Sequence, residues 1–470
     1  MESHRDNQII KVMSGESFTP YALARKLNAK AILESATFDG GRARYSLLMV
    51  QEAFRVYQNQ RGIFFADGNK RYRVKTPARD ILEVLSYFGD QHRPPKQDFP
   101  FPAGGIGYLG WEFAQRCDTV HLETFPDPLG IPEAMFLFGH VLIIFDHYSD
   151  LLYLIGLNYK ERSIDLEQAL KETEQRIHDL NFNYLQDAER QYQVTPIYEP
   201  GEEERFKEGV LKIKEEIVAG NLLQCVLSRR KRLRTDMPAL EAYRRLRSSN
   251  PAPYLVYMDF DQFQLFAASP EVHVQVKEGR ALMRPIAGTR RRGGTAEEDR
   301  ALERELLQDA KELAEHLMLV DLARNDLGRV CTPGSVRVTD YHTIERYSRV
   351  MHIVSQVEGA LAPGMSGLDA LRATFPAGTV SGAPKIRAME TLSRIEQLPR
   401  SFYAGVAGYV EPGGNLDSCI TIRAGLRIRD ELVLQAGAGV VFDSNPQREY
   451  TETNEKLSAL LRAVGMEVDL

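Results

Sequence analysis

The stretch KELAEHLMLVDLARND, Lys311 to Asp326, has helical spacing and is apolar on almost every side, so it is expected to be a buried helix. At about 100° per residue, Glu312 and Glu315 share one sector of this helix with Leu319. A buried, ionised glutamate is costly unless a cation or hydrogen-bond donors meet it. Either this sector reaches the surface and pairs with neighbouring basic side chains, or the two glutamates bind something.

A second pair of glutamates stands near the C-terminus, in NPQREYTETNEKLSALLRAV. Pro446 suits a helix start, and Glu449, Glu452 and Lys456 then fall on one helical face. Taken alone, Glu452 and Lys456 form an ordinary surface ion pair. If the two helices face one another, their four carboxylates form an oxygen-only site of the kind that Mg²⁺ accepts. Zinc is disfavoured because ELAEH lacks the two-histidine spacing of HExxH.

The composition is that of an intracellular globular protein. A chain of 470 residues suits one large or two interlocked domains. With 59 basic and 65 acidic residues, a net charge of −6 and no long block of like charge, it is not expected to bind nucleic acid. The four cysteines lie far apart without a CxxC pair, which argues against zinc and disulfides and favours a reducing compartment. The polar start MESHRDNQ and the short apolar runs predict a soluble, cytoplasmic protein.

The pattern along the chain predicts mixed helices and strands. A β-hairpin is expected near residues 139–158, followed by a helix in LEQALKETEQRIHDL. A polar segment with Pro and Gly near 185–204 divides the chain into subdomains 1–190 and 200–470. Beyond it, ERFKEGVLKIKEEIVAG and ALEAYRRLRS are helical, LLQCVLSRRKRL is extended, and PYLVYMDFDQFQLFAAS forms a hairpin.

Two glycine-rich stretches differ in how strongly they indicate a binding site. GIGYLG, Gly105 to Gly110, matches GxGxxG, the pattern of dinucleotide-binding turns. The prolines before it fit poorly with the buried strand that such a turn requires. A role in packing or in a tight turn is therefore favoured over cofactor binding by a nicotinamide oxidoreductase. In LQAGAGVVFD, Gly437 and Gly439 follow an apolar run, where backbone N–H groups could approach a carboxylate. A plain kink in a strand is the alternative there.

Taken together, many blocks resemble the chorismate-utilising enzymes, and among them most closely the large subunits of anthranilate synthases. The matching blocks, in chain order, are LESA, LLQCVLSRR, NPAPYLVY, AASPE, RPIAGTRRRG, KELAEHLMLVDLARNDLGRVC, YSRVMHIVSQVEG, FPAGTVSGAPKIRAME, YAGVAGY, LDSCITIRA and QAGAGVVFDSNPQREYTETNEK. The resemblance implies an α/β fold of the α+β type: two packed, antiparallel-rich β-sheets flanked by helices, with the active site in a deep cleft. The part up to 190 would hold part of a regulatory pocket, and 200–470 the chorismate-binding catalytic domain.

The resemblance also implies Mg²⁺ as cofactor, with Glu315 and Glu452 as ligands and Glu312 and Glu449 as partners through water. The ion would neutralise the ring carboxylate of chorismate. The second carboxylate, on the enolpyruvyl arm, would need an arginine fork and backbone donors. The substrate-binding positions implied are Gln224, Ala287, Gly288, Thr289, Tyr403, Arg423, Gly437, Ala438, Gly439 and Lys456.

Three residues match the family's catalytic positions: Glu271 of SPE, His352 of VMHIV and Thr379 of GTVSG. Ammonia would attack C2 while Glu271, as general acid, protonates the departing C4 hydroxyl. That role needs a pKa raised by desolvation or neighbouring anions. His352 would then remove the C2 proton as pyruvate is eliminated. Without the resemblance, His352 would be interpreted as a structural histidine of a strand with its hydrogen bonds met inside the protein. Thr289 and Thr379 would be interpreted as turn residues.

Two positions discriminate among the relatives. Aminodeoxychorismate synthases usually carry a lysine nucleophile where this chain has Ala287. Isochorismate and salicylate synthases carry a water-activating lysine where it has Gln224, whose neutral amide cannot deprotonate water. Both positions favour anthranilate as the product. No cysteine lies in a glutaminase nucleophile elbow, so a separate glutamine amidotransferase subunit is expected to supply ammonia within a hetero-oligomer.

Feedback control is a further implication of the resemblance. Two stretches match the halves of the family's tryptophan pocket: Glu34 and Ser35 in LESA, and Pro253, Tyr254 and Leu255 in NPAPYL. Ala252 and Leu255 depart from the common Ser and Met. Three alternatives remain at this stage: an aminodeoxychorismate synthase, an aminodeoxyisochorismate synthase that does not eliminate pyruvate, and a non-catalytic protein that binds tryptophan or chorismate.

Overall fold

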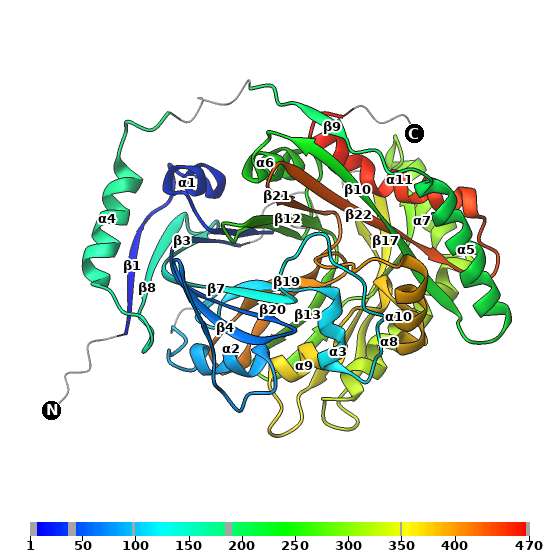
Figure 1. The fold of residues 1–470 in the computed structure, drawn as a ribbon, viewed down its shortest axis with the longest axis horizontal. Helices are drawn as coiled ribbons and strands as arrows, with labels where there is room; N and C mark the ends of the chain where they lie inside the picture. Colours follow the sequence, from blue (N-terminus) through cyan, green and yellow to red (C-terminus); the bar gives the residue numbers. More distant parts are fainter. Residues whose placement is uncertain (1–6, 36–43, 96–98, 184–189, 348–349, 467–470) are drawn as a thin grey trace.

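The computed structural model describes residues 7–35, 44–95, 99–183, 190–347 and 350–466 (Figure 1). The α-helices are α1 (Pro20–Leu27), α2 (Ile81–Gly89), α3 (Ala114–Cys117), α4 (Leu166–His178), α5 (Glu202–Val218), α6 (Ala239–Ser249), α7 (Ala296–Leu306), α8 (Ala310–Gly328), α9 (Gly367–Thr374), α10 (Lys385–Glu396) and α11 (Pro446–Ala463). Short 3₁₀ turns are η1 (Trp111–Phe113), η2 (Gly378–Val380) and η3 (Pro412–Gly414).

The first strands of the chain are β1 (Gln8–Ser14), β2 (Ala31–Glu34), β3 (Tyr45–Asn59), β4 (Gly62–Asp67), β5 (Lys70–Arg73), β6 (Ile106–Leu109), β7 (Ala134–Asp146), β8 (Leu151–Leu157) and β9 (Val194–Pro196). The next are β10 (Gln224–Thr235), β11 (Tyr254–Asp259), β12 (Phe263–Ser269), β13 (Val272–Lys277), β14 (Arg280–Met283) and β15 (Ile286–Arg291). The last are β16 (Arg337–Arg346), β17 (Val350–Ala360), β18 (Gly382–Ala383), β19 (Val406–Val410), β20 (Leu416–Ile420), β21 (Ala424–Ile428) and β22 (Glu431–Val440).

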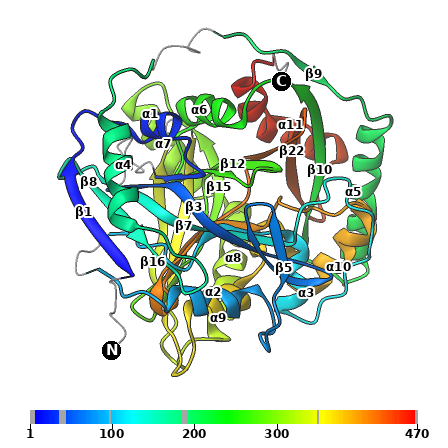
Figure 2. The same ribbon diagram turned by 60° about the vertical axis from the view of Figure 1, so that its left-hand side comes forward.

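The strands are joined by antiparallel pairings into one extensive network, and helices cover it from several sides (Figures 1 and 2). Helix α11 packs on β22, α6 on β12, α5 and α10 on β10, and α8 on β15 and β17. The predicted fold class, a mixed α/β protein with antiparallel-rich sheet flanked by helices, is confirmed. Helices α8 and α11, which carry the two glutamate pairs, therefore pack on different strands of this network.

The helices and strands predicted from local residue patterns are present in the structure. The hairpin expected near 139–158 is β7 and β8, which pair from Val141 with Gly156 onwards. The helical patterns became α4, α5 and α6, and the two extended patterns became β10 and the β11–β12 hairpin. GIGYLG is not a dinucleotide-binding turn: it contains β6, an antiparallel strand between β7 and β19, and a 3₁₀ turn rather than a long helix follows it.

The proposed division near residue 190 stays a prediction. Strands from the two parts are hydrogen-bonded neighbours, because β2 pairs with β11 and β6 with β19. One buried cluster also runs through both parts, from Ala31 to Val440. Within the described ranges, none of the helices combines the length and apolar character needed to cross a membrane.

Candidate active site

Helix α8 presents the first glutamate pair. It begins at Ala310, directly after Asp309, whose carboxylate caps the helix by accepting the backbone N–H groups of Lys311 and Glu312. The expectation that this helix is buried on nearly every side is only partly right, because Leu317 is 46 % exposed. The side that packs on β15 and β17 buries Leu319 and Val320 instead. Glu312 and Glu315, in the same sector as Leu319, are half-buried and lie at the border of the core.

Glu315 is the better enclosed of the pair. Its Oε1 accepts a hydrogen bond from Nε2 of Gln224 on β10 at 3.1 Å. Burial raises the pKa of Glu315, and the nearby carboxylates of Glu312 and Glu452 raise it further. Glu452 belongs to α11, so the structure brings carboxylates of the two helices within electrostatic reach of one another.

Helix α11 carries the second pair. Asn445 caps its start and Pro446 occupies the first turn. Glu449 is 7 % exposed, and its Oε2 has no hydrogen-bond partner among the described residues. Burial raises the pKa of Glu449, and Glu452 adds to the effect. A buried carboxylate oxygen without a donor, next to other carboxylates, is what an absent cation would satisfy.

The four carboxylates do not form a closed cage. Glu312 is drawn to Arg290 of β15, whose Nη1 lies 3.3 Å from its Oε1. Glu452 pairs with Lys456 at 2.7 Å. No group of three or more His, Cys, Asp or Glu side chains is close enough to hold a metal ion in the part of the chain that the structure describes. The donor types and the orphaned oxygen fit Mg²⁺, and the two basic partners would have to yield to it.

Glu271 lies between β12 and β13 and is 8 % exposed. Burial raises the pKa of its carboxyl to about 8, against the opposing effects of the Thr379 hydroxyl and of Lys456. The rise expected for a general acid is therefore present, and desolvation is its cause. Two residues further on, burial lowers the pKa of His273 to about 3, so this second group remains neutral.

His352 of β17 stands opposite Thr289 of β15. Its Nδ1 lies 3.0 Å from the carbonyl oxygen of Gly288, which can only accept, so Nδ1 carries the hydrogen and Nε2 keeps its lone pair. Gly288 has a φ of +65° at a bulge between Ala287 and Thr289, and this bulge turns the carbonyl toward the ring. Burial and the charge of Arg423 lower the pKa of His352, which keeps the imidazole neutral.

The predicted carboxylate-binding groups gather around β22. Lys456 donates to the carbonyl oxygen of Gly437 at 2.9 Å. A Cβ on Gly437 would lie 3.0 Å from the hydroxyl of Tyr403, and one on Gly439 would lie 2.9 Å from Nε2 of Gln224. Both glycines therefore keep the sheet open on the face that Tyr403 and Gln224 share. Close approach of a ligand to this backbone requires residues without a side chain.

Ala438 and Arg423 differ from these glycines in which of their atoms can reach a ligand. Ala438 is fully buried and alternates to the other face of β22, so only its backbone can reach a ligand. Arg423 has a φ of +49° between β20 and β21. Burial lowers its pKa while Tyr403 and Glu452 act to raise it, and no ion pair to its guanidinium forms within the described residues. Arg423 is available to bind an anion.

The two predicted halves of a tryptophan pocket do meet. Strand β2 pairs with β11, which sets Glu34 directly opposite Leu255. The carboxylate of Glu34 is already bound, since it accepts hydrogen bonds from the hydroxyl of Tyr243 at 2.7 Å and from Nη2 of Arg247 at 3.1 Å. Ser35 and Pro253 directly adjoin these strands. Ala36 lies outside the described residues.

Arg290 is a site residue that the sequence reasoning missed. Its guanidinium joins Glu305 of α7, the helix cap Asp309 and Glu312, at 2.9, 2.8 and 3.3 Å. It therefore sets both the start of α8 and the position of one predicted metal partner. The signal available was its place in GTRRRG, directly after Thr289, although nothing local to that run says which arginine turns inward.

Comparison with known proteins identifies the family of this chain. Residues 37–462 match the model of a family described as chorismate binding enzyme. Anthranilate synthase component 1 of Spirochaeta aurantia is 59 % identical over 464 residues, which are 98 % of this chain and 96 % of that protein. Its counterpart from Aquifex aeolicus is 39 % identical over 95 % of this chain and 92 % of that protein. The crystal structure of anthranilate synthase component I from Streptococcus pneumoniae TIGR4 superposes with a TM-score of 0.78 at 34 % identity, covering 89 % of this chain and 92 % of that one.

Proposed function

Since the chain belongs to the chorismate-binding enzymes, and among them to the anthranilate synthase component I proteins, we propose that it converts chorismate and ammonia to anthranilate and pyruvate in a Mg²⁺-dependent reaction. The observation that carries this proposal is that the pKa values of two groups shift in opposite directions: that of the buried Glu271 is raised and that of the half-buried His352 is lowered. Glu271 has a pKa of about 8 and holds its proton at neutral pH, while His352 is kept neutral. Such a pair supplies one acid and one base at the same pH.

The site's cations suit a dianionic substrate. Arg423 has no ion pair within the described residues, and Lys456 lies between Glu452 and the carbonyl oxygen of Gly437. In this proposal Arg423, Tyr403 and the backbone at Gly437 and Gly439 hold the enolpyruvyl carboxylate. Glu315 and Glu452 hold Mg²⁺, with Glu312 and Glu449 behind them. When bound, the ion supplies positive charge against the ring carboxylate.

In this proposal, different residues act in the successive steps of the reaction. Ammonia enters beside Gln224 and attacks C2. Glu271 gives its proton to the C4 hydroxyl, which leaves as water. Nε2 of His352 afterwards takes the proton from C2, and pyruvate is lost as the ring becomes aromatic. Thr289 contacts Nδ1 of His352 at 3.1 Å, and the hydroxyl of Thr379 acts to lower the pKa of Glu271.

The choice of anthranilate over related products is supported by Ala287 and Gln224. Neither offers an amine, so neither can attack C2 covalently or activate water. Gln224 is instead held by Glu315. We further propose that a separate glutamine amidotransferase subunit supplies the ammonia and that tryptophan inhibits by binding where β2 meets β11. The support for the inhibitory site is the adjacency of Ser35 to the Glu34–Leu255 pairing.

The test is to incubate the purified chain with chorismate, Mg²⁺ and ammonium at alkaline pH and to identify the aromatic product by fluorescence and mass. Anthranilate with pyruvate is the expected result. An aminated product that retains the enolpyruvyl group would limit the proposal to the first step. No turnover, together with chorismate binding that is indifferent to EDTA, would overturn it.

A further inference from the structure

His316 occupies the middle of the buried side of α8, directly after the predicted metal ligand Glu315. Its side chain is fully buried, and at about 100° per residue it lies between Leu319 and Val320, which are buried as well. Burial lowers the pKa of His316 to about 4, so the ring is neutral. An apolar side chain would fill this position without the cost of burying polar atoms. The histidine therefore needs a physical reason.

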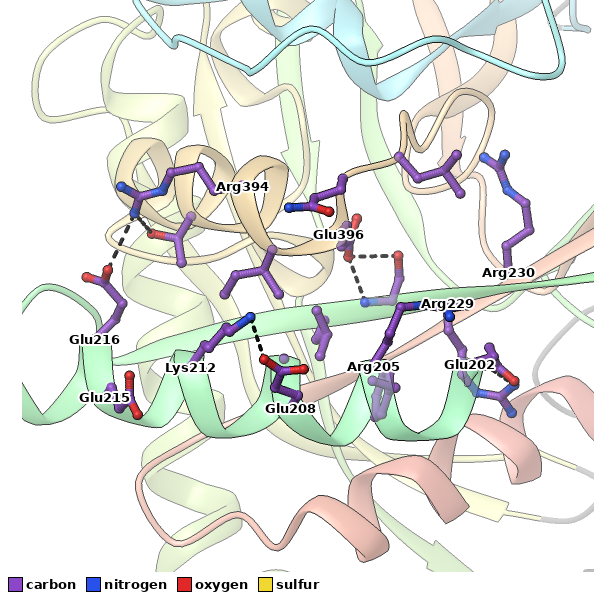
Figure 3. A pocket seen from close by; sticks show the side chains of 18 of the residues that line it. Glu202, Arg205, Glu208, Lys212, Glu215, Glu216, Arg229, Arg230, Arg394 and Glu396 are labelled. Atoms are coloured by element: carbon purple, nitrogen blue, oxygen red, sulfur yellow. Dashed lines mark hydrogen bonds and ion pairs between the residues drawn. The ribbon is translucent and has the colours of Figure 1, made fainter. Parts of the chain in front are cut away.

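Apolar packing alone does not fix how α8 is rotated about its axis. Helix α5 provides the contrast. It buries Phe206 and Val210 on one side, and Figure 3 shows the charged side chains that it carries where it lines a cavity of about 660 Å³. Helix α8 instead has leucines on several sides, since Leu319 is buried, Leu313 is half-buried and Leu317 is exposed. The hydrophobic effect has no direction, so a rotated α8 would bury one leucine in place of another.

The ring of His316 supplies a directional contact. Its Nε2 lies 2.6 Å from Oγ of Ser355 on β17, and its Nδ1 has no hydrogen-bond partner among the described residues. Oγ of Ser355 also accepts the backbone N–H of His342 at 3.1 Å, which leaves the hydroxyl hydrogen to be donated to Nε2. A hydrogen bond weakens steeply as its angle departs from linearity, so this bond resists rotation of α8.

Ser355 is itself held by the strands around it. Its backbone N–H donates to the carbonyl oxygen of Pro285, directly before β15, at 3.2 Å. On its other side β16 is irregular between Asp340 and Thr343, and His342 there has a φ of +56°. This bulge turns the backbone N–H of His342 toward the serine hydroxyl. The hydroxyl is thus a fixed point of the sheet against which α8 is oriented.

The orientation of α8 bears directly on the candidate metal site. Glu315 accepts its hydrogen bond from Gln224 on the side of the helix next to His316. Glu312 lies one turn before His316, and its Oε2 is 3.3 Å from the point at which a side chain on Gly288 would begin. Mg²⁺ requires near-octahedral geometry with oxygen ligands at about 2.0–2.1 Å, so it tolerates little displacement of a carboxylate.

We propose that His316 is a positioning residue of the metal site: its hydrogen bond to Ser355 fixes the rotation of α8 and so directs Glu315 toward Mg²⁺. The same rotation sets the position of Glu312. This inference rests on the Mg²⁺ site of the proposed function, and it adds a residue that acts through the helix without touching the ion or the substrate.

Isothermal titration with Mg²⁺ measures the effect without turnover. His316→Phe keeps a ring in the core but removes both nitrogens, and its affinity for Mg²⁺ should be weaker than the parent's by roughly tenfold or more. The Mg²⁺ concentration for half-maximal turnover should rise by the same factor, while kcat at saturating Mg²⁺ stays near the parent value. A role in stability alone would lower the melting temperature and leave both Mg²⁺ measurements unchanged.

Two further variants test the hydrogen bond itself. His316→Gln restores a polar group that can bond to Ser355, so its Mg²⁺ affinity should return close to that of the parent. Ser355→Ala removes the same bond from the other side and should weaken Mg²⁺ as His316→Phe does. The double variant should be no weaker than either single one, because each change removes the same interaction. Ser355→Ala deletes a single oxygen, so it carries the test even if His316→Phe does not fold.

His140→Phe is the matched control. His140 of β7 is also a buried histidine with one bonded ring nitrogen, since its Nδ1 lies 2.7 Å from the carbonyl oxygen of Leu157 and its Nε2 has no partner among the described residues. The neighbours of β7 in the sheet are β3, β6 and β8, none of which carries a residue of the metal site. The Mg²⁺ affinity of His140→Phe should equal that of the parent, whatever its melting temperature.

The proposal is overturned by parent-like Mg²⁺ affinity in His316→Phe and Ser355→Ala. It is also overturned if His140→Phe loses as much affinity as His316→Phe, because the effect would then follow from general destabilisation. His316→Gln that binds Mg²⁺ as weakly as His316→Phe would exclude the hydrogen bond as the cause. A parent protein that binds no Mg²⁺, with or without chorismate, would overturn the metal site of the proposed function and this inference with it. The two failures are distinguishable because only the second appears in the parent.

Discussion

The side-chain amide of Gln224 donates a hydrogen bond from Nε2 to Oε1 of Glu315 at 3.1 Å, which ties β10 to α8. The same nitrogen lies where a side chain on Gly439 would begin, 2.9 Å from its ideal Cβ. The glycine on β22 thus leaves room for the amide that orients a predicted metal ligand. The space at Gly439, the amide of Gln224 and the carboxylate of Glu315 therefore depend on one another.

Gly439→Ala is expected to push the Gln224 amide away from Glu315. The amide is the end of a flexible side chain, so the fold should persist and the melting temperature should change little. A hydrogen bond to a charged group contributes about 1.5–3 kcal/mol, so the Mg²⁺ concentration for half-maximal turnover should rise roughly tenfold or more. Gly328→Ala, where a Cβ would meet nothing within 4 Å, is the control and should match the parent. Parent-like Mg²⁺ dependence in Gly439→Ala would contradict the coupling.

Glu449→Gln tests the proposed metal site. Glu449 has a buried oxygen without a donor, and loss of a supporting carboxylate typically weakens a metal by about 10- to 100-fold. Isothermal titration with Mg²⁺ measures the affinity directly, and turnover against Mg²⁺ concentration measures its effect. Glu455→Gln is the matched control on the same helix, because Glu455 pairs with Arg448 at 2.8 Å and faces solvent. Equal Mg²⁺ affinity in the parent and Glu449→Gln would remove this residue from the site.

The pH dependence of turnover should carry an alkaline limb near pH 8. Glu271 has a pKa of about 8 and acts only while protonated, so activity at a fixed concentration of free ammonia should fall as pH rises through that value. Glu271→Gln should lower kcat roughly a hundred- to ten-thousand-fold and abolish the limb. A limb that survives in Glu271→Gln would belong to another group.

The same shift predicts an effect on stability. The folded carboxyl has a pKa raised from 4.5 to about 8, so its contribution to stability is fully present below 4.5 and is lost as pH rises toward 8. Glutamine does not titrate. The melting temperature of Glu271→Gln relative to the parent should therefore increase between pH 4.5 and 8 and level off outside that window. A constant difference across this range would contradict the buried, protonated carboxyl.

His352→Gln should separate the two chemical steps. Amination needs Glu271, whereas loss of pyruvate needs a base at C2, so this variant should accumulate an aminated product that keeps the enolpyruvyl group, detectable by mass. Burial lowers the pKa of His352, so the acid limb of the parent's pH profile should lie below 6.5. Normal yields of anthranilate from His352→Gln would assign the base to another residue.

Ser35→Phe tests the tryptophan pocket. Ser35 follows β2 where that strand pairs with β11, so a ring at this position should obstruct tryptophan while leaving the chorismate site intact. The concentration of tryptophan for half-inhibition should rise at least tenfold with turnover near the parent value. Ser248→Phe, on an exposed position of α6, should leave inhibition unchanged. Unaltered inhibition in Ser35→Phe would remove Ser35 from the pocket.

Much of this molecule was predictable from short stretches of the chain. The spacing of apolar residues located α4, α5, α6 and the β7–β8 hairpin, because this spacing depends on neighbours within a few positions. The spacing of Glu449 and Glu452 put both on one helical face for the same reason. Many blocks taken together, SPE and VMHIV among them, resembled the chorismate-utilising enzymes, and this resemblance nominated Glu271 and His352.

Other features came only from the tertiary structure. Glu271 is protonated because packing removes water from it, and His352 is neutral because packing and Arg423 disfavour its charge. Arg290 turns toward Glu312 because α8 packs on β15. Residue types and local spacing are written in the sequence. The burial of each side chain, the dielectric around it and the partner of each charged group depend on the tertiary structure, because distant strands and helices create them when they pack together.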